Sequence, residues 1–442
     1  MRTWIKDPLA IFAEGAERGL VVEGTSIAER VKRGETPERI DATFDASRHV
    51  VLPGLINTHH HFYQTLTRAH PSAINKPLFA WLVALYPIWA RLKPNDLRLA
   101  ARLALTELML SGCTTAADHH YLYPEGLENA VDIEVEEARA LGMRLTVSRG
   151  SMNLSAKDGG LPPDSVVQNE ETILADSERV LKLFHDSKLG AQIQVALAPC
   201  SPFTISKDLM RESARLAERY DCRLHTHLGE TEDEERFCLK MYGLRPVDLL
   251  EETGWMSDRV WLAHGVHFNA DEIARLGQAK VGVCHCAASN MVLASGICRT
   301  CELEAAGVAL GLGVDGSASN DSSNMMEALR HALMAGRLRY GADKVTHRDV
   351  LRWATEGSAR CLGRSDIGKI AEGYAADLAL FKLDEPRFSG AHDSLAALVL
   401  CGAHRADRVM IAGDWRVVDG APVALDLERL MAEHGRAARD FA

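Results

Sequence analysis

Residues 51–65, VLPGLINTHHHFYQT, join an apolar run to three consecutive histidines and a glutamine. The apolar run is typical of a buried strand, and side chains alternate between the two faces of a strand. His59 and His61 are therefore expected to point one way and His60 the other. Two imidazoles at positions i and i+2 can bind one metal ion. A single pair of this kind is more often an exposed loop cluster, so the metal hypothesis depends on what the other strands supply.

The same pattern recurs along the chain: a short apolar, β-branched run ends in polar residues, and a helix-like stretch follows. Seven further runs start at Cys113, Arg144, Gln192, Arg223, Arg259, Lys280 and Val308. Near-continuous apolar runs are typical of parallel strands that are buried on both faces. Eight strand–helix units predict a (β/α)8 TIM-like barrel, an α/β fold, over residues 51–365.

The two ends of the chain have a different pattern. Residues 1–50 and 366–442 contain short strand-like pieces with turns, such as GLVVEG, ADLALFKL and DRVMIAGDWRVVDG. Chain termini often lie close together at the surface of a protein. We therefore predict a small β-sandwich domain that is built from both termini.

Composition restricts the partners and the location. The net charge of −11 argues against nucleic acid and against an anionic membrane as partners, but it leaves a small molecule open. No stretch approaches the roughly 18 apolar residues of a membrane span, and charges interrupt the apolar residues of the N-terminus. We expect a cytoplasmic protein. The ten cysteines are scattered, which favours reduced, partly buried thiols over a disulfide framework.

Candidate site residues fall where the predicted strands end, and in a barrel of this kind these ends share one face. They are His59–His61, Asp118–His120, His225, His227, Glu230, His264, His285 and Asp315. His225 and His227 share a strand face, so spacing alone does not decide between them. Glu230 is placed to move protons without being a ligand, and glycines flank Asp315. Three histidines with this aspartate predict a metal site with an open coordination position.

The motifs PGLINTHHH, HTHLGE, LAHG, CHCAASNMVLASG, GLGVDGSASN and GKIAEGYAADLALF resemble the amidohydrolase superfamily, in the family's order and over essentially the whole chain. The most similar branch is that of the single-metal nucleobase deaminases and triazine hydrolases. The resemblance implies that one divalent ion, Zn²⁺ or alternatively Fe²⁺, is held by His59, His61, His227 and Asp315. It further implies that Glu230, His264 and Asp315 carry out the proton transfers. Cys286 stands where the family usually has an asparagine.

The substrate expectation also comes from resemblance. HHHFYQ and PLFAWL resemble guanine deaminases, which implies that Gln64 contacts a purine edge and that Trp81 forms an apolar wall. Cys200 stands where those enzymes have an arginine. The longer strings NTHHHFYQTLTRA and DHHYLYP are most similar to 8-oxoguanine deaminases. The leading expectation is therefore purine catabolism by conversion of 8-oxoguanine and water to urate and ammonia. Isoxanthopterin, guanine and hydroxyatrazine-type triazines stay open as substrates.

Arg149 and Asn153, in SRGSMN at the end of the third predicted strand, are candidates for substrate contact, and a structural role for Arg149 is an equal alternative. The roles of His60, Asp118, His119, His120, His285 and Cys286 are not assigned.

Two other classes of protein fit the sequence less well. A cyclic-amide hydrolase with two metal ions would need a lysine near the fourth strand, and AQIQVALAPCSPF contains none. A non-catalytic metal-binding protein would not need Glu230 and His264 beside the ligands. The resemblance also implies a homodimer.

Overall fold

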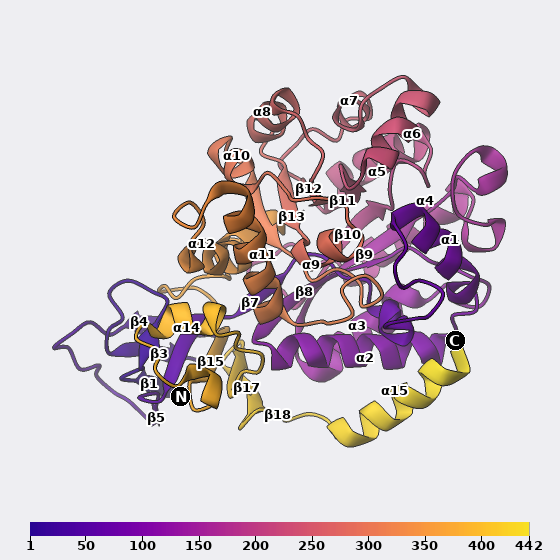
Figure 1. The fold of residues 1–442 in the computed structure, drawn as a ribbon. Helices are drawn as coiled ribbons and strands as arrows, with labels where there is room; N and C mark the ends of the chain where they lie inside the picture. The colour runs from indigo at the N-terminus through magenta and orange to yellow at the C-terminus, as the bar shows by residue number, and fades with distance from the viewer. Residues whose placement is uncertain (442) are drawn as a thin grey trace.

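The computed structural model describes residues 1–441, and its central sheet has eight parallel strands in consecutive order. The strands are β7 (Leu55–Asn57), β8 (Cys113–His120), β9 (Arg144–Ser151), β10 (Ile193–Pro199), β11 (Arg223–Leu228), β12 (Val260–His264), β13 (Gly282–His285) and β14 (Ala309–Leu312). Backbone hydrogen bonds from Thr58 N to Leu312 O and from Asp315 N to His59 O join the first strand to the last. The sheet therefore closes, which confirms the predicted (β/α)8 barrel (Figure 1).

Helices follow each barrel strand and surround the sheet (Figure 1). The segments after β7 to β10 are η1 (Phe62–Thr67), α1 (Leu78–Trp89), α2 (Pro94–Leu110), α3 (Ala130–Leu141), η2 (Ala156–Asp158), η3 (Asp164–Val166), α4 (Glu170–Phe184) and α5 (Lys207–Tyr220). Those after β11 to β14 are α6 (Glu232–Tyr242), α7 (Pro246–Glu252), α8 (Ala270–Gln278), α9 (Ala287–Val292), α10 (Thr300–Ala305), α11 (Met325–Tyr340), α12 (His347–Arg352), η4 (Trp353–Gly357) and α13 (Ser358–Cys361).

Two smaller sheets lie outside the barrel, one built from the N-terminal residues alone and one from both ends of the chain. The four-stranded sheet has the order β4-β3-β1-β5 and the six-stranded sheet the order β18-β17-β16-β15-β6-β2. Their strands are β1 (Arg2–Lys6), β2 (Ala10–Ile11), β3 (Gly19–Glu23), β4 (Ser26–Arg30), β5 (Ala42–Asp45), β6 (His49–Pro53), β15 (Leu378–Lys382), β16 (Arg408–Ile411), β17 (Asp414–Val418) and β18 (Ala421–Pro422). Buried apolar side chains from both sheets, among them Ile5, Leu20, Val51 and Leu380, form one cluster between them.

The opening stretch differs from the single barrel strand expected over residues 51–57. It is divided at Gly54: β6 pairs with β15 in the small sheet, and only β7 belongs to the barrel. A Cβ atom at Gly54 would lie 2.1 Å from Thr114 Oγ1, so the chain can pass β8 here only with glycine. The Pro53-Gly54 pair is a turn signal within the apolar run.

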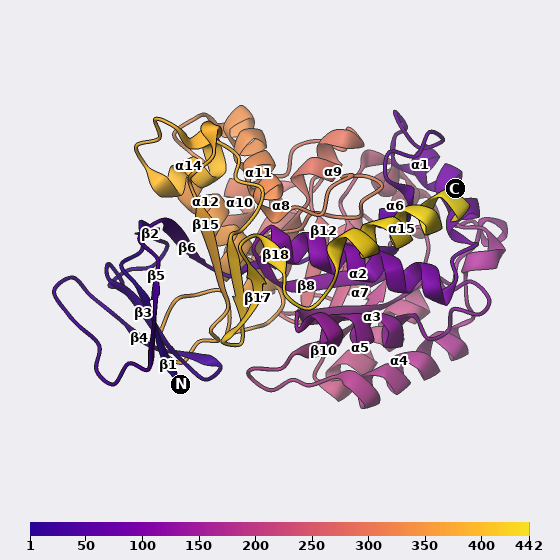
Figure 2. The ribbon, with the colours of Figure 1, turned by 90° about the horizontal axis from the view of Figure 1, so that it is seen from below.

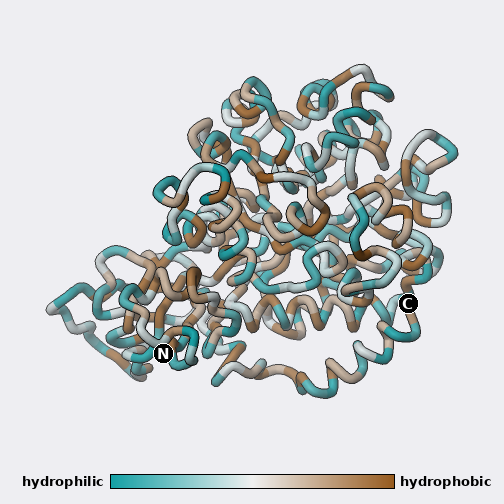
Figure 3. The backbone as a smooth tube through the Cα atoms, viewed as in Figure 1, coloured by the Kyte–Doolittle hydropathy of each residue, from teal (hydrophilic) through white to brown (hydrophobic). Residues whose placement is uncertain are grey.

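The last part of the chain also differs from expectation. After η5 (Pro386–Phe388) and α14 (Ser394–Leu400), helix α15 (Leu427–Phe441) leaves the small sheets and lies along α2 (Figures 1 and 2). Apolar and polar stretches alternate along it (Figure 3), and its buried residues are Leu430, His434 and Phe441. His434 Nε2 lies 3.0 Å from Thr65 Oγ1, so this helix supports η1 beside the barrel mouth.

Two further sequence expectations are met. All ten cysteines are free, and eight of them are buried. Among residues 1–441, no helix combines the length and the apolar character needed to cross a membrane.

Candidate active site

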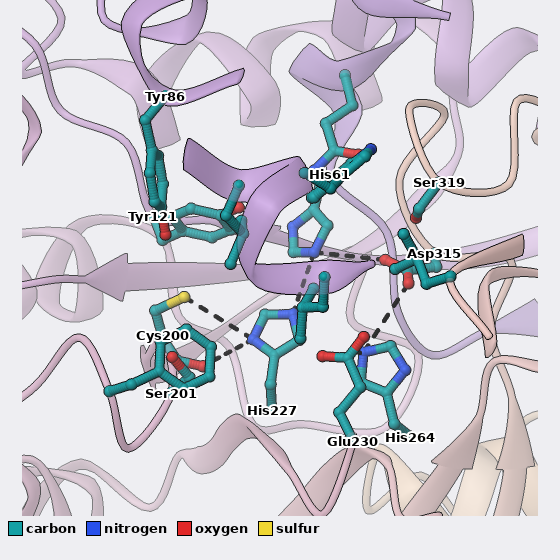
Figure 4. Close-up of a pocket in the computed structure, with 16 residues that line it drawn as sticks. His61, Tyr86, Tyr121, Cys200, Ser201, His227, Glu230, His264, Asp315 and Ser319 are labelled. Carbon is teal, nitrogen blue, oxygen red and sulfur yellow. Dashed lines mark hydrogen bonds and ion pairs between the residues drawn. The ribbon is translucent and has the colours of Figure 1, made fainter. Parts of the chain in front are cut away.

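Three histidine side chains meet at the carboxyl ends of β7 and β11. His61 Nε2 lies 3.2 Å from His227 Nε2 and 3.4 Å from Oδ1 of Asp315, which follows β14 (Figure 4). His59 comes from the same turn as His61, although both residues lie just beyond the last residue of β7. His60 points away and binds Ser323 Oγ at 2.8 Å, as expected for the odd member of the triplet.

The hydrogen bonds of these rings determine which nitrogen keeps a lone pair. His61 Nδ1 lies 2.8 Å from the carbonyl oxygen of His119, and His227 Nδ1 lies 2.7 Å from that of Cys200. A carbonyl oxygen can only accept, so both Nδ1 atoms carry a proton and both Nε2 atoms are free to bind a metal.

His59 reaches the same state through a chain of two rings. His225 Nδ1 lies 2.8 Å from the carbonyl oxygen of Trp261 and must donate to it. His225 Nε2 therefore accepts from His59 Nδ1, at 2.8 Å. His59 Nε2 is left buried without a hydrogen-bond partner. The structure thus separates the two histidines of HTH: His225 orients His59, whereas His227 presents a free nitrogen to the site.

The spacing of the free atoms fits a metal ion. His59 Nε2 and His61 Nε2 each lie 3.4 Å from Asp315 Oδ1. Four ligands at about 2.0–2.1 Å from a tetrahedral zinc ion lie about 3.3–3.4 Å from one another. The orphaned nitrogen of His59 and these distances suit a metal ion, and the set of four ligands stays a prediction.

Protonation states agree with this arrangement. Burial lowers the pKa of His61 to about 4 and that of His227 to about 3, and it lowers the pKa of His59 well below the usual value. The rings are therefore neutral at pH 7, as metal binding requires. Burial alone would raise the pKa of Asp315, but the neighbouring His59 more than offsets this and holds it well below its ordinary range.

Glu230 and His264 lie directly beside the four ligands (Figure 4). Glu230 Oε2 is 3.5 Å from His264 Nε2, which is also 3.9 Å from Asp315 Oδ2. Burial raises the pKa of Glu230 to about 7, with His264 opposing this shift and Asp315 adding to it. Burial alone would lower the pKa of His264, but the carboxylates of Glu230 and Asp315 reverse the direction and raise it. A carboxyl group with a pKa near 7 can both give and take a proton.

The backbone at the site is held in an unusual conformation. His264 has φ +76° and Asp315 has φ +67°, in the left-handed region, which His and Asp enter more readily than most residues other than glycine. Gly313 and Gly316 flank Asp315 where a Cβ atom would meet His59 at 2.9 Å and Gln64 Oε1 at 1.9 Å. The flanking glycines therefore permit close backbone approach, as the sequence predicted.

A small cavity of about 30 Å³ lies beside these side chains. Half of its lining residues are aromatic or apolar, and the other half are polar or charged (Figure 4). The lining residues are His61, Gln64, Leu78, Trp81, Leu82, Tyr86, Tyr121, Cys200, Ser201, Phe203, His227, Glu230, His264, Leu293, Asp315 and Ser319.

Gln64 and Trp81 are both anchored on the loop after β14. Gln64 Oε1 accepts from Ala318 N at 3.3 Å, and Trp81 Nε1 donates to Ala318 O at 3.0 Å. The remaining hydrogen-bonding group of the Gln64 amide is its NH2, beside the cavity. Cys200 also lines the cavity, with its Sγ 3.8 Å from His227 Nδ1.

Arg149 and Asn153 do not line this cavity, in contrast to the substrate contacts expected of them. The guanidinium of Arg149 donates to Asp176, Gln168 and Gly150 O and lies 3.9 Å from the centroid of the Tyr123 ring. Asn153 exchanges two hydrogen bonds with Ser206, the residue that caps α5. The polar groups of both side chains are used within the fold, which is the structural alternative that was left open for Arg149.

Several residues that line the cavity were not predicted from the sequence. Tyr86, Tyr121 and Phe203 come from a helix and two loops, and nothing in their local pattern distinguishes them from core aromatics. Tyr121 directly follows the DHH of residues 118–120 at the end of β8, and that position was the one available signal. His119 stacks on His227, with ring centroids 4.7 Å apart, and its Nε2 is bound to Ala198 O.

The chain belongs to the amidohydrolase family, whose sequence profile matches residues 50–416. It is 63% identical over 441 residues to the 8-oxoguanine deaminase of Pseudomonas aeruginosa, covering 99% of this chain and 98% of that protein. It is also 36% identical over 425 residues to an isoxanthopterin deaminase from an unknown prokaryotic organism, covering 92% of this chain and 88% of that protein.

Solved structures agree with the fold. The atrazine chlorohydrolase TrzN from Arthrobacter aurescens TC1, complexed with zinc, superimposes with a TM-score of 0.93 at 32% identity and covers 99% of this chain and 100% of its own. An amidohydrolase from an environmental sample of the Sargasso Sea superimposes with a TM-score of 0.84 at 32% identity, covering 100% of this chain and 99% of its own.

Proposed function

We propose that this protein is a metal-dependent deaminase that converts 8-oxoguanine and water to urate and ammonia. The observation that carries the proposal is the convergence of three free imidazole nitrogens and the Asp315 carboxylate beneath a cavity, beside a Glu230 whose pKa is about 7. The choice of 8-oxoguanine is supported by the 63% identity to a deaminase of that base.

His59, His61, His227 and Asp315 would hold one ion, for which zinc is our proposal; ferrous iron accepts the same ligand types. When bound, such an ion lowers the pKa of a water molecule toward about 7 and so supplies hydroxide at neutral pH.

Glu230 and His264 would manage the protons of the reaction. Protonated Glu230 donates to the ring nitrogen next to the carbon that bears the amino group, which makes this carbon more electrophilic. The water-derived oxygen forms a C–O bond at the carbon, Glu230 takes up the proton that this oxygen releases and delivers it to the amino nitrogen, and the C–N bond breaks to release ammonia. His264 and Asp315 hold the attacking oxygen in line through their hydrogen bonds.

Gln64 and the aromatic walls would select the ring. The NH2 group of Gln64 can donate to a carbonyl oxygen or ring nitrogen of a purine-like base. Trp81, Tyr86 and Phe203 offer flat, apolar surfaces for a planar ring.

Ammonia release from a panel of substrates tests this function. Purified protein would be given 8-oxoguanine, guanine, isoxanthopterin, hydroxyatrazine, cytosine and adenosine at equal concentration. We expect 8-oxoguanine to have the highest kcat/KM. Preference for isoxanthopterin or a triazine would replace the substrate assignment and leave the metal site standing, whereas no ammonia from any of them would reject the deaminase.

Six sequence-based expectations stay predictions. They are the division into a barrel over residues 51–365 and a second domain from residues 1–50 and 366–442, the roles of the site residues, the zinc ion, purine catabolism, the homodimer and the cytoplasmic location.

A further inference from the structure

A second polar cluster lies outside the cavity and has no part in the proposed reaction. Asp118 and His120 are on β8, and Glu134 is on α3, which packs against the barrel. One potential ligand atom from each side chain lies within 4.8 Å of the other two. All three residues are at most 1% exposed.

His120 presents a lone pair to this cluster. Its Nε2 lies 2.7 Å from the carbonyl oxygen of Leu122 and must therefore donate to it. Burial lowers the pKa of His120 to about 4, so the ring is neutral at pH 7 and Nδ1 has no proton. This Nδ1 faces Glu134 Oε1 at 3.2 Å, yet the two atoms form no hydrogen bond.

The two carboxyl groups also lack hydrogen-bond donors. Asp118 Oδ1 accepts from Phe62 N at 2.7 Å, but Asp118 Oδ2 and both oxygens of Glu134 have no hydrogen-bond donor. The nearby Arg149 donates to Asp176, Gly150 O and Gln168, and no hydrogen bond joins it to either carboxyl. Burying an unsatisfied polar group costs about 1–3 kcal/mol, and more when the group is charged. Burial raises the pKa of Glu134 to about 8 and that of Asp118 well above its usual value, so without a cation both carboxyls hold protons, which a bound metal ion would displace.

The same geometric signature is found at the candidate catalytic centre. There, His59 Nε2 and Asp315 Oδ1 are 3.4 Å apart and also form no hydrogen bond. At both places a ring nitrogen and a carboxylate oxygen lie at about the edge length of a zinc coordination tetrahedron, roughly 3.3 Å. The two carboxylates would neutralise a divalent cation placed between Asp118, His120 and Glu134. The cation would in turn accept the lone pairs of His120 Nδ1 and of the carboxylate oxygens, which have no other partner.

We propose that Asp118, His120 and Glu134 form a second, closed binding site for a divalent cation, with zinc as the expected ion. Unlike the first site it opens onto no substrate cavity, so its role is structural. Asp118 would link the ion to the backbone of Phe62, the residue after His61 and the first of η1. The ion would thereby stiffen the segment that carries Gln64.

Metal analysis of the intact protein tests this site independently of any substrate. Protein purified from zinc-supplemented medium and freed of loosely bound metal should contain two zinc ions per chain by mass spectrometry. Glu134→Gln should contain one. The matched control is Glu137→Gln on the same helix, because Glu137 is also buried but is already paired with Arg98 and Arg102. This control should keep two ions.

One zinc ion per chain in the wild type would overturn the proposal, and so would two ions retained in Glu134→Gln. If Glu134→Gln does not fold, Asp118→Asn and His120→Gln decide the location by the same count. Ammonia release plays no part in this count, so the second site can fail while the proposed deaminase stands, and the reverse also holds.

Discussion

The two ends of the cavity are built in different ways. At the metal end, His227 and His264 lie in barrel strands, and His59, His61 and Asp315 follow strand ends, with ring nitrogens fixed largely by backbone carbonyls. At the ring-binding end, the side chains come from η1, α1 and loops, and Gln64 and Trp81 are held by one loop residue, Ala318. In the proposed function the barrel would therefore provide the chemistry, and the segments beside it the recognition of the substrate ring.

This difference predicts how substitutions at each end of the cavity change kcat and KM. Changes at the metal end should remove transition-state stabilisation and lower kcat, whereas changes at the ring-binding end should mainly raise KM. Each of the following substitutions tests that separation.

The largest effect is expected from Glu230→Gln. The amide cannot transfer protons, and loss of a general acid–base group costs about 10²–10⁴-fold in rate. Steady-state kinetics should show this loss in kcat, while metal analysis should show the same metal content as the wild type, because Glu230 is not among the four ligands. Turnover at the wild-type level would refute the role assigned to Glu230.

Gln64→Leu tests the opposite end of the cavity. Removal of one hydrogen-bonding group should reduce kcat/KM for 8-oxoguanine by about 10–100-fold, corresponding to roughly 1.5–3 kcal/mol. The loss should appear mainly in KM, and the metal content should not change. If kcat fell while KM stayed constant, Gln64 would belong with the reacting groups.

Two alanine substitutions in the same loop sharpen the comparison. Gly316→Ala would place a Cβ atom 1.9 Å from Gln64 Oε1, whereas Gly313→Ala would place one 2.5 Å from Cys284 Sγ and 2.9 Å from His59 Cβ. We expect the first to raise KM by about tenfold, because it displaces a single substrate hydrogen bond, and the second to lower metal content. Identical effects of the two substitutions would show that the ends are not independent.

The metal end was largely predictable from the sequence because strand geometry repeats. A histidine or an acid at the end of each apolar run implies convergence at one face, without knowledge of any contact. Even there, the spacing of the two histidines along the strand could not show whether His225 or His227 faces the metal site. The difference between them depends on the hydrogen bonds that His225 forms with the carbonyl of Trp261 and with His59. Those partners lie in two other barrel strand–loop units.

The ring-binding end was less predictable because its contacts join distant segments. Trp81 reaches Ala318, and Thr65 reaches His434 in the C-terminal helix, which had been expected to belong to a β domain. Arg149 occupies a strand end like the proposed site residues, but its guanidinium is paired with a local acid, Asp176. Position on the barrel alone does not show which side chains are already satisfied.

The smallest effect is expected from Glu234, whose side chain holds the backbone next to the metal end in place. Its carboxyl group accepts from Gly229 N at 2.7 Å and from Glu230 N at 3.3 Å, and burial raises its pKa to about 8. The folded pKa lies above the ordinary value of 4.5, so the folded state binds an extra proton between the two values. The stabilisation is complete below about pH 4.5 and is lost as the pH rises through about 8, with a slope on the order of 1 kcal/mol per pH unit.

Glu234→Gln resembles the protonated form at every pH and should remove this slope. Urea unfolding at pH 6, 7 and 8 should therefore show a shallower decline of the free energy of unfolding in the variant than in the wild type. Glu232→Gln, on the exposed first turn of the same helix, is the matched control and should keep the wild-type slope. Parallel lines for Glu234→Gln and the wild type would mean that Glu234 is ionised in the folded state. The Glu230 backbone would then be held by a carboxylate rather than by a neutral acid.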